Sequence, residues 1–356
     1  MNRRHDTFRY RQLAWALMLL TLAAAGCNLP LPAGLNALTP SQVVPDMLAH
    51  TSQSQYAGWI ADLSGARAVE IGGERVTIGS RYNYAMFTGQ PNARVVDYLL
   101  ERLHAWVPER QIEVDPYPYK DAERAYTWQN IIVTLPGSRL PQERVLLTAH
   151  MDSTTYPEDA LQLAPGADDN ASGTAALLEA VRLLRYYRFE RTIQVIFFSG
   201  EEHGLQGSRA YLQDHSSDGI VGVINLDMIA YDADGDRCME FHVGSLPQSL
   251  AVGEALAGSI VRHGLALNYD FVTQGATDRS DHASFWQAGV GAVLVSENWF
   301  DQGNPAGCGG ADFNPNYHNP SDTIDKLDLT VGYEVTRLAL AALAEMAGPI
   351  GTAFRW

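Results

Sequence analysis

Apolar residues recur along this chain in two patterns, one typical of helices and one typical of buried strands. Between residues 93 and 106 they return every three or four positions, which predicts an amphipathic helix with one buried face. Continuous apolar runs predict buried strands at residues 130–135, 145–149, 192–199, 220–228 and 291–296. Further helical patterns lie at residues 174–188, after Gly204, at 250–263 and at 331–347.

This alternation of strands and helices predicts the fold class. Fully apolar strands are typical of a parallel sheet whose two faces are both covered by helices. We therefore expect an α/β protein with one three-layer α/β/α domain and a central mixed, mostly parallel sheet. Ahead of it, residues 47–64 carry a helical pattern, and residues 68–78 predict a β-hairpin that turns at Gly72-Gly73.

The first 26 residues resemble an export signal. Four arginines precede an apolar run at residues 13–25, which ends in Ala24-Ala25-Gly26. Cys27 follows directly, as in the lipobox of bacterial lipoproteins, in which this cysteine is lipidated and becomes the new N-terminus. We therefore expect a lipoprotein signal peptide at residues 1–26 and an extracytoplasmic protein, at the cell surface or in the periplasm, held to the membrane by a lipid anchor at Cys27.

Two alternatives remain open for this segment. They are an ordinary signal peptide of a secreted protein, with a cysteine there by coincidence, and an uncleaved membrane anchor. A run of about 13 apolar residues is short for a membrane span, which needs about 20. The segment that follows is rich in proline and carries no charge at residues 28–45, so residues 27–46 are expected to be a tether and 47–356 the folded domain.

Acidic residues outnumber basic ones, with 41 Asp and Glu against 25 Lys and Arg, which gives a formal net charge of -16. Residues 1–26 carry four Arg and one Asp, or +3, so the rest of the chain carries -16 - 3 = -19. A surface of this charge repels polyanions. We therefore expect neither nucleic acid nor an anionic membrane surface as a partner.

Side chains that bind metals follow three of the predicted strands. His150 and Asp152 follow the strand at 145–149, Glu201 and Glu202 follow the next one, and Asp227 lies at the end of the third. Ligands of open α/β sheets bind at the carboxyl ends of the strands. A single acid there is explained as a helix cap or a solvated turn residue, but three successive strands that end in this way are not.

Residues 165–173 (PGADDNASG) add an acidic bend before the helix at 174–188. Taken alone, the bend is explained by helix capping, because Asp, Asn and Ser are good N-caps. Together with the acids and histidines around it, the bend indicates a pair of divalent metals. Zinc takes His nitrogen and carboxylate oxygen, two metals about 3.5–4 Å apart need a bridging carboxylate, and a further carboxylate must accept a proton from water.

Five segments together resemble a known family. They are His150-Met-Asp152, GADDNASG at 166–173, FSGEEHGLQGS at 198–208, NLDM at 225–228 and Tyr317-His318. In this order they resemble the co-catalytic zinc aminopeptidases of peptidase family M28, and the likeness runs from about residue 90 to 347. The resemblance implies the zinc-peptidase (phosphorylase/hydrolase-like) fold and two bound Zn²⁺ ions.

The resemblance implies a role for each metal ligand: His150, Asp169, Glu202, Asp227 and His318. Asp169 would bridge the two zinc ions. His150 and Asp227 would complete one metal site, and Glu202 and His318 would complete the other. Cobalt or manganese can fill such sites as well.

The resemblance also implies the reactive and supporting groups. Glu201 would be the general base for a zinc-bridged water and then the acid, and Tyr317 would aim its phenol at the tetrahedral oxyanion. Asp152 would hydrogen-bond to His150 and fix its tautomer. Asp168 would be a helix cap or a supporting acid, and His282 would lie near the site rather than on a metal. The Asp169–Asn170 peptide bond would be cis.

These expectations describe an exported metallo-aminopeptidase that acts on peptides with a free N-terminus. One alternative is a glutaminyl cyclase, a single-zinc acyltransferase of the same fold with equivalents of Asp169, Glu202, His318 and Glu201. Another is a carboxypeptidase or dipeptidase, which needs a basic residue such as Arg279 for the substrate carboxylate. The last is a non-catalytic surface binding lipoprotein. Side-chain specificity, oligomeric state and the pairing of Cys238 with Cys308 stay open at this stage.

Overall fold

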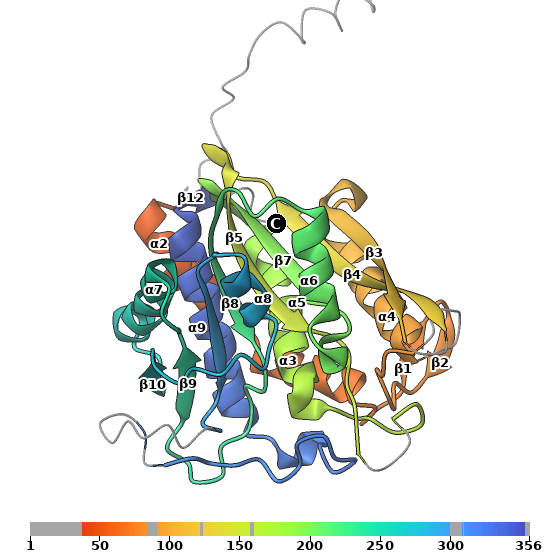
Figure 1. Ribbon diagram of the computed structural model, residues 1–356. Coiled ribbons are helices and arrows are strands. Elements are labelled where there is room, and N and C mark those ends of the chain that lie inside the picture. The colour runs from red at the N-terminus through yellow and green to blue at the C-terminus, as the bar shows by residue number, and fades with distance from the viewer. Residues whose placement is uncertain are drawn as a thin grey trace, which may run out of the picture. The chain divides into compact units, whose positions relative to one another are not determined.

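An eight-stranded sheet forms the centre of the fold, in the order β10-β9-β11-β8-β5-β7-β4-β3 (Figure 1). The computed structural model describes residues 38–84, 91–121, 124–156, 160–299, 308 and 310–352. The strands are β3 (Ile112–Lys120), β4 (Ala125–Leu135), β5 (Leu140–His150), β7 (Arg191–Phe198), β8 (Ile220–Leu226), β9 (Cys238–His242), β10 (Asn268–Val272) and β11 (Ala292–Glu297). The pairs β5–β7, β5–β8, β8–β11 and β9–β10 are parallel, and the pairs β3–β4, β4–β7 and β9–β11 are antiparallel. The predicted mixed, mostly parallel sheet is confirmed.

Helices cover both faces of this sheet (Figure 1). They are α4 (Pro91–Trp106), α5 (Gly173–Leu184), α7 (Pro247–His263) and α9 (Leu329–Ala347) on one face, and α6 (Gln206–Asp214) and α8 (His282–Gln287) on the other. Strand β5 shows why both faces must be apolar, since Val145 and Leu147 pack in the core of the first face and Leu146 in the core of the second. Each such buried aliphatic side chain stabilises the fold by about 1.5–3 kcal/mol. The three-layer architecture is therefore confirmed.

The folded region begins earlier than the sequence predicted. Helices α2 (Pro40–Ala49) and α3 (Gln53–Leu63) replace the single predicted helix at 47–64. Val43 and Met47 of α2 are fully buried in the main core, so residues 40–46 are not a tether. The helix tolerates Pro40 because it lies in the first turn, where a backbone N–H would have no partner within the helix. A capping box formed by Thr39 and Gln42 stabilises the same turn. The predicted signal peptide, Cys27 and the first part of the tether lie outside the described residues.

Two small sheets complete the described fold. Strands β1 (Val69–Ile71) and β2 (Glu74–Val76) form the predicted hairpin, and Gly72 and Gly73 turn the chain at φ +61° and +81°, which glycine adopts without strain. Strand β6 (Tyr187–Phe189) pairs antiparallel with β12 (Pro349–Thr352). Helix α5 thus ends at Leu184, and the predicted helix at 174–188 was too long.

Cys238, the first residue of β9, forms a disulfide with Cys308, with the two Cα atoms 5.8 Å apart. The sequence alone left this pairing open. Among the described residues, no helix has both the length and the apolar composition that crossing a membrane requires.

Candidate metal centre

Acidic and histidine side chains meet at the carboxyl ends of three neighbouring strands. His150 is the last residue of β5, and Asp227 directly follows β8. Glu201 and Glu202 begin a short turn, Glu201–His203, after β7. Because β5 lies between β7 and β8 and is parallel to both, the three strand ends share one edge of the sheet. The topology therefore brings together residues that are far apart in the sequence.

Asp169 lies between two histidines that approach it from different segments. Its Oδ1 is 3.2 Å from Nε2 of His150, and its Oδ2 is 3.2 Å from Nε2 of His318. The same nitrogen of His150 is 3.2 Å from Oδ1 of Asp227. Nε2 of His318 is 2.9 Å from Oε2 of Glu202. The five predicted metal ligands thus form two groups that share one carboxylate.

An irregular turn, Ala167–Ser172, holds Asp169 in this position. Gly166 precedes it at φ +50°, and a Cβ there would lie 2.2 Å from the Asp169 carbonyl oxygen, so no other residue fits. The Asp169–Asn170 peptide bond is cis, as the resemblance implies. The Asn170 side chain donates to the carbonyl of Leu226 and accepts from the N–H of Gly173, both at 2.9 Å. The turn is thereby tied to β8 and α5.

The donor set and its charges fit divalent cations. Three carboxylates and two imidazoles are the ligand types that zinc takes. Burial opposes a charge on His318, but hydrogen bonds to Asp169 and Glu202 overcome it and raise the pKa of His318 to about 10. Oε1 of Glu202 is buried with no hydrogen-bond partner in the described part of the chain. A strongly negative potential and an unsatisfied acceptor together indicate a place for positive ions.

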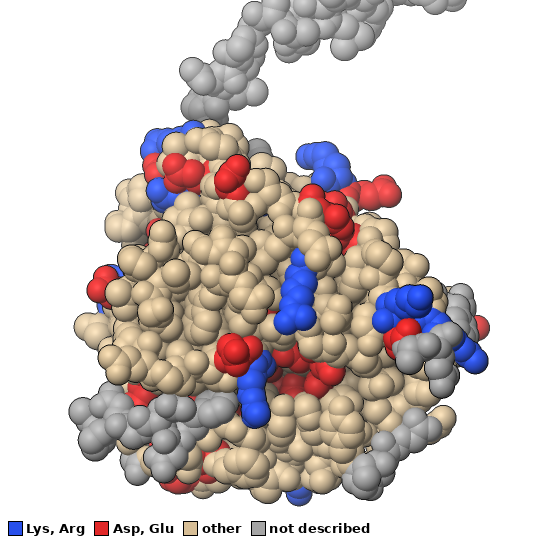
Figure 2. All heavy atoms as spheres, viewed as in Figure 1, with Lys and Arg blue, Asp and Glu red and all other residues tan. Residues whose placement is uncertain are grey.

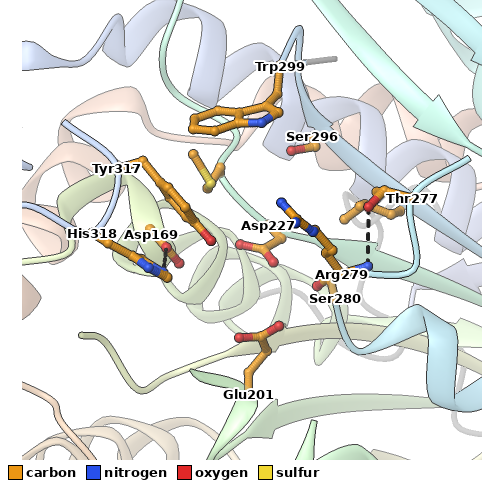
Figure 3. A pocket seen from close by; sticks show the side chains of 12 residues that line it. Asp169, Glu201, Asp227, Thr277, Arg279, Ser280, Ser296, Trp299, Tyr317 and His318 are labelled. Atoms are coloured by element: carbon orange, nitrogen blue, oxygen red, sulfur yellow. Dashed lines mark hydrogen bonds and ion pairs between the residues drawn. The ribbon is translucent and has the colours of Figure 1, made fainter. Parts of the chain in front are cut away.

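Glu201 and Tyr317 point into the pocket beside these ligands (Figure 3). Burial raises the pKa of Glu201 well above its usual range, and the charge of Glu202 adds to this effect although His150 opposes it. The Tyr317 ring stacks on His318, with ring centroids 3.7 Å apart, and burial raises the pKa of its phenol. The Glu201 carboxyl therefore faces the pocket from outside the set of five candidate ligands, and the Tyr317 phenol keeps its hydrogen.

Asp152 supports both metal-binding groups. Its Oδ1 lies 3.6 Å from Nδ1 of His150, and its backbone carbonyl lies 3.2 Å from the same nitrogen. The two carboxylate oxygens also accept the backbone N–H groups of Glu201 and Glu202, at 3.3 and 3.4 Å. The contact with His150 expected from the resemblance is present, and the same carboxylate fixes the turn after β7.

Asp168 and His282 lie away from the ligand atoms. The Asp168 carboxylate accepts the N–H of Ala230 at 2.9 Å and Nδ2 of Asn314 at 3.0 Å, so it joins two loops instead of capping α5. His282 is fully buried at the start of α8, and its Nε2 hydrogen-bonds to the carbonyl of Thr277 at 2.9 Å. Both side chains support the loops of the site.

Arg81 is a buried residue that reasoning from the sequence missed. Its guanidinium is fully buried and donates to the carbonyls of Met151 at 2.9 Å, Pro165 at 2.6 Å and Gly166 at 2.8 Å. It thereby joins the segment after His150 to the bend that carries Asp169. No motif marks this arginine in the sequence.

Asp322 was missed as well. Its two oxygens accept the backbone N–H groups of Asp168 and Asp169, at 2.9 and 3.1 Å. The signal that could have found it is its place in Ser321-Asp322-Thr323, four residues after His318.

The pocket lining contains both apolar and polar side chains. Its lining includes the apolar side chains of Met228, Leu294 and Trp299. It also includes the polar side chains of Thr277, Arg279 and Ser280 (Figure 3). Figure 2 shows a hollow with acidic side chains at its floor on the face that it presents. The pocket thus offers carboxylates to a cation and apolar surface to a side chain.

Known proteins are similar to this chain in sequence and in fold. A probable leucine aminopeptidase of Trichophyton verrucosum is 26% identical over 310 residues, which cover 85% of this chain and 78% of that protein. A zinc aminopeptidase from Bacillus subtilis of known structure is 27% identical with a TM-score of 0.50, over 64% of this chain and 55% of that one.

A glutaminyl cyclase from Porphyromonas gingivalis has the same fold. It superimposes with a TM-score of 0.63 over 83% of this chain and 98% of its own, at 18% identity. Identity this low shows the fold alone. The sequence profile of peptidase family M28 matches residues 130–343, which is more than half of the chain and spans all the site segments from His150 to His318. The chain therefore belongs to peptidase family M28.

Proposed function

We propose that this protein is a zinc-dependent aminopeptidase with two metal ions, which hydrolyses the N-terminal peptide bond of peptides. The observation that carries the proposal is the position of Asp169, whose two oxygens face His150 and His318 in separate groups. A carboxylate shared in this way suits two ions about 3.5–4 Å apart. Glu201 points into the same pocket from outside the ligand set and is free to act on a proton.

The chain's own groups account for the proton transfers. Bound zinc would polarise the scissile carbonyl and make water more acidic. Glu201 takes the proton from the attacking water and returns it to the leaving amine, and its raised pKa suits a group that must hold a proton between two steps. Tyr317 donates its hydroxyl hydrogen to the oxygen that becomes negative during attack.

The pocket lining also suits a peptide substrate that has a free N-terminus and an apolar first residue. Asp227 and Glu201 line it and attract an ammonium group. Met228, Leu294 and Trp299 also line it and offer apolar surface to an aliphatic side chain. The similar protein from Trichophyton verrucosum is described as a probable leucine aminopeptidase, which agrees with a preference of this kind.

The decisive test is Glu201→Gln, which keeps the shape of the side chain and removes the base. We expect release of amino acid from an aminoacyl-anilide to fall by about 10²–10⁴-fold, while metal analysis still finds two zinc ions per chain. Asp278→Asn is the matched control, because Asp278 is an exposed acid between the pocket residues Thr277 and Arg279 but is not itself in the lining or the ligand set. Full turnover by the Glu201→Gln variant with zinc bound would overturn the proposal and leave a binding protein.

The rival reactions are separated by metal content and product. A glutaminyl cyclase would hold one zinc and close N-terminal glutamine to pyroglutamate. The close contact of His150 with both Asp169 and Asp227 favours a second ion. A carboxypeptidase or dipeptidase would require a free substrate carboxylate near Arg279, so an uncharged anilide would not be cleaved. Chelator-sensitive cleavage of the anilide together with two zinc ions excludes both.

We further propose that the protein is exported and carries its lipid on Cys27. The support is the sequence of residues 1–27, with its arginines, apolar run and Ala-Ala-Gly-Cys ending. The Cys27→Ser variant should lose incorporation of labelled fatty acid and leave the membrane fraction. If the variant instead stays membrane-bound, the segment is an uncleaved anchor.

A further inference from the structure

A second group of metal-binding side chains lies outside the candidate metal centre. It comprises Glu113 and Asp115 of β3 and His215, the residue that directly follows α6. One ligand atom of each side chain lies within 4.8 Å of the other two. We call this group the β3–α6 cluster. None of its residues belongs to the ligand set around Asp169, and none lines the pocket beside that set.

The backbone brings the three side chains of the cluster together. Side chains two positions apart on a strand point to the same face, so Glu113 and Asp115 share one face of the edge strand β3. Helix α6 packs against β3 and its neighbour β4 (Figure 1). At the end of α6 the His215 N–H donates to the carbonyl of Tyr211 at 2.8 Å, and the two rings stack with centroids 4.7 Å apart. The imidazole is thus fixed beside the carboxylates.

Two atoms of the cluster face each other without a hydrogen bond. The Asp115 side chain is only 8% exposed, and its Oδ2 accepts Nδ2 of Asn130 at 3.1 Å, which leaves Oδ1 for another partner. Nε2 of His215 is enclosed and has no hydrogen-bond partner in the described part of the chain. It lies 3.7 Å from Oδ1 of Asp115, beyond the usual range for a hydrogen bond. Buried polar atoms of this kind need a partner.

A metal ion between the two atoms accounts for their spacing. Zinc binds His nitrogen at about 2.0–2.1 Å and carboxylate oxygen at about 2.0–2.2 Å, so a tetrahedral site separates the two ligand atoms by about 3.4 Å. A charge-assisted hydrogen bond would hold them at about 2.7–2.9 Å. The observed separation of 3.7 Å is nearer to the first value. Glu113 would supply a third ligand from an exposed position and leave the fourth to water.

The charge of the cluster also suits a cation. Among the described residues, the ion-pair partner of Asp115 is His215, and Glu113 has no ion pair. Arg144 approaches the end of α6, but it donates to the carbonyl of Asp218 at 2.9 Å and to the Tyr211 hydroxyl at 3.2 Å. The two negative charges are therefore not neutralised by an arginine or a lysine.

Asp115 is linked to the segment that carries Glu201. Nδ2 of Asn130 donates both to Asp115 and to the carbonyl of Gly207, each at 3.1 Å. Its Oδ1 accepts the N–H of Ser199 at 3.2 Å. Ser199 lies just before the turn of Glu201, and Gly207 lies just after it in the first turn of α6. The Asp115 carboxylate thus orients an amide that holds both ends of this turn.

We propose that the β3–α6 cluster binds an additional divalent transition-metal ion, for which zinc is the best match. Two carboxylates and one imidazole with an open position for water are ligands that zinc takes. The imidazole disfavours calcium and magnesium, which prefer oxygen ligands alone. The ion would fasten the end of α6 to the edge strand β3. This inference does not depend on the proposed peptidase activity.

The test counts zinc in the chain without residues 1–27, which keeps the whole compact unit from residue 38 onward. Metal analysis follows dialysis against buffers of increasing free zinc concentration. The additional zinc should fill after the zinc at Asp169, because the cluster offers fewer ligands and one of them is exposed. At the highest free zinc concentration, His215→Gln should hold one zinc ion fewer than the wild type.

Glu113→Gln is a second variant, at an exposed position where the substitution leaves the core intact. It should need at least about 10-fold more free zinc to fill the additional site, since even groups that only orient a ligand contribute about 10–100-fold to metal affinity. An unchanged zinc titration in Glu113→Gln would contradict the three-ligand site.

The matched control is His50→Gln, which removes a histidine that faces one carboxylate, Asp46 at 3.9 Å, and belongs to no described group of three ligands. It should hold as much zinc as the wild type. Equal zinc in the wild type and His215→Gln overturns the proposal and leaves only an ion pair between His215 and Asp115. Loss of the same zinc in His50→Gln also overturns it, because the binding is then not specific to the cluster.

Discussion

Asp322 holds the backbone of Asp169 from a distant part of the chain, since its Oδ2 accepts the Asp169 N–H at 3.1 Å. Its Oδ1 accepts the N–H of Asp168 at 2.9 Å. Both contacts are buried, so water does not replace them. The position of Asp169, the carboxylate proposed to bridge the two ions, therefore depends on a residue outside the candidate ligand set.

Asp322→Asn should weaken zinc binding by about 10–100-fold, which is the usual effect of losing a group that orients a metal ligand. The amide nitrogen of asparagine would face a backbone N–H where the carboxylate offers an acceptor. Competition with a chromogenic chelator measures the change. Asp325→Asn, at an exposed position three residues further on, should leave zinc affinity unchanged. Wild-type affinity in Asp322→Asn would show that Asp322 does not position Asp169.

Tyr317→Phe should lower kcat by about 10²–10³-fold with little change in KM, because the phenol acts on the oxygen that becomes negative only during the reaction. Steady-state kinetics on an aminoacyl-anilide measures both constants. Tyr156→Phe is the control, since the Tyr156 ring also lies beside His318, with centroids 5.7 Å apart, but does not line the pocket. A loss confined to KM would assign Tyr317 to substrate binding alone.

Two glycine-to-alanine substitutions should change stability in opposite directions. A Cβ at Gly207 would lie 2.4 Å from both Oδ1 of Asn130 and the carbonyl of Ser199, so Gly207→Ala should destabilise the protein by about 1–3 kcal/mol. At Gly258 on α7 the nearest atom belongs to the flexible end of Arg262, so Gly258→Ala should be neutral or stabilising by up to about 1 kcal/mol. Urea unfolding measures both. A tolerated alanine at 207 would mean that α6 can shift away from β7.

His282 should make the folded state less stable in acid. Burial lowers its pKa from 6.5 to about 3, although the carbonyl of Thr277 opposes this effect. Above pH 6.5 neither the folded nor the unfolded chain holds a proton on His282, so the free energy of unfolding has its full value. As the pH falls from 6.5 towards 3, only the unfolded chain takes up the proton, and the free energy of unfolding falls by up to about 1.4 kcal/mol per pH unit.

The measurement compares wild type with His282→Gln by urea unfolding at several pH values, with chelator present so that metal release does not contribute. Glutamine keeps a donor for Thr277 and does not titrate. The variant should therefore lose stability less steeply below pH 6.5. Parallel curves for the two proteins would show that His282 is protonated in the fold.

The sequence predicts the centre of this fold well because its strands are buried on both faces. Strands β5, β7, β8 and β11 each contain a short, mainly apolar run whose residues are buried. The helical patterns between these runs favour a sheet of such strands over further helices. Strand β3 was missed because it lies at the sheet edge, where Pro116 and Pro118 cost few hydrogen bonds and charged residues face water. Strand β9 was missed because it contains two polar residues, Glu240 and His242, and so is not an apolar run. Both can be buried because their side chains hydrogen-bond to each other.

The candidate ligands were found because each follows a strand end or lies in a motif with fixed spacing. Arg81 and Asp322 have neither property. They act through backbone groups of segments far away in the sequence, and such contacts leave no periodic pattern. The tether prediction failed for a related reason, because Pro40 and Pro45 indicate an extended chain unless the buried Val43 and Met47 are read as one face of a helix.

The order of the ligands along the chain determines when the enzyme can first act. Four of them, from His150 to Asp227, are synthesised well before His318, and the group around Glu202 has no imidazole until the segment near residue 318 is in place. The backbone carbonyl of His318 must also meet the N–H of Tyr156, which anchors that late segment to the early half of the fold. A chain that is still being synthesised therefore lacks the full set of candidate ligands. The five side chains come together only when almost the whole chain has folded.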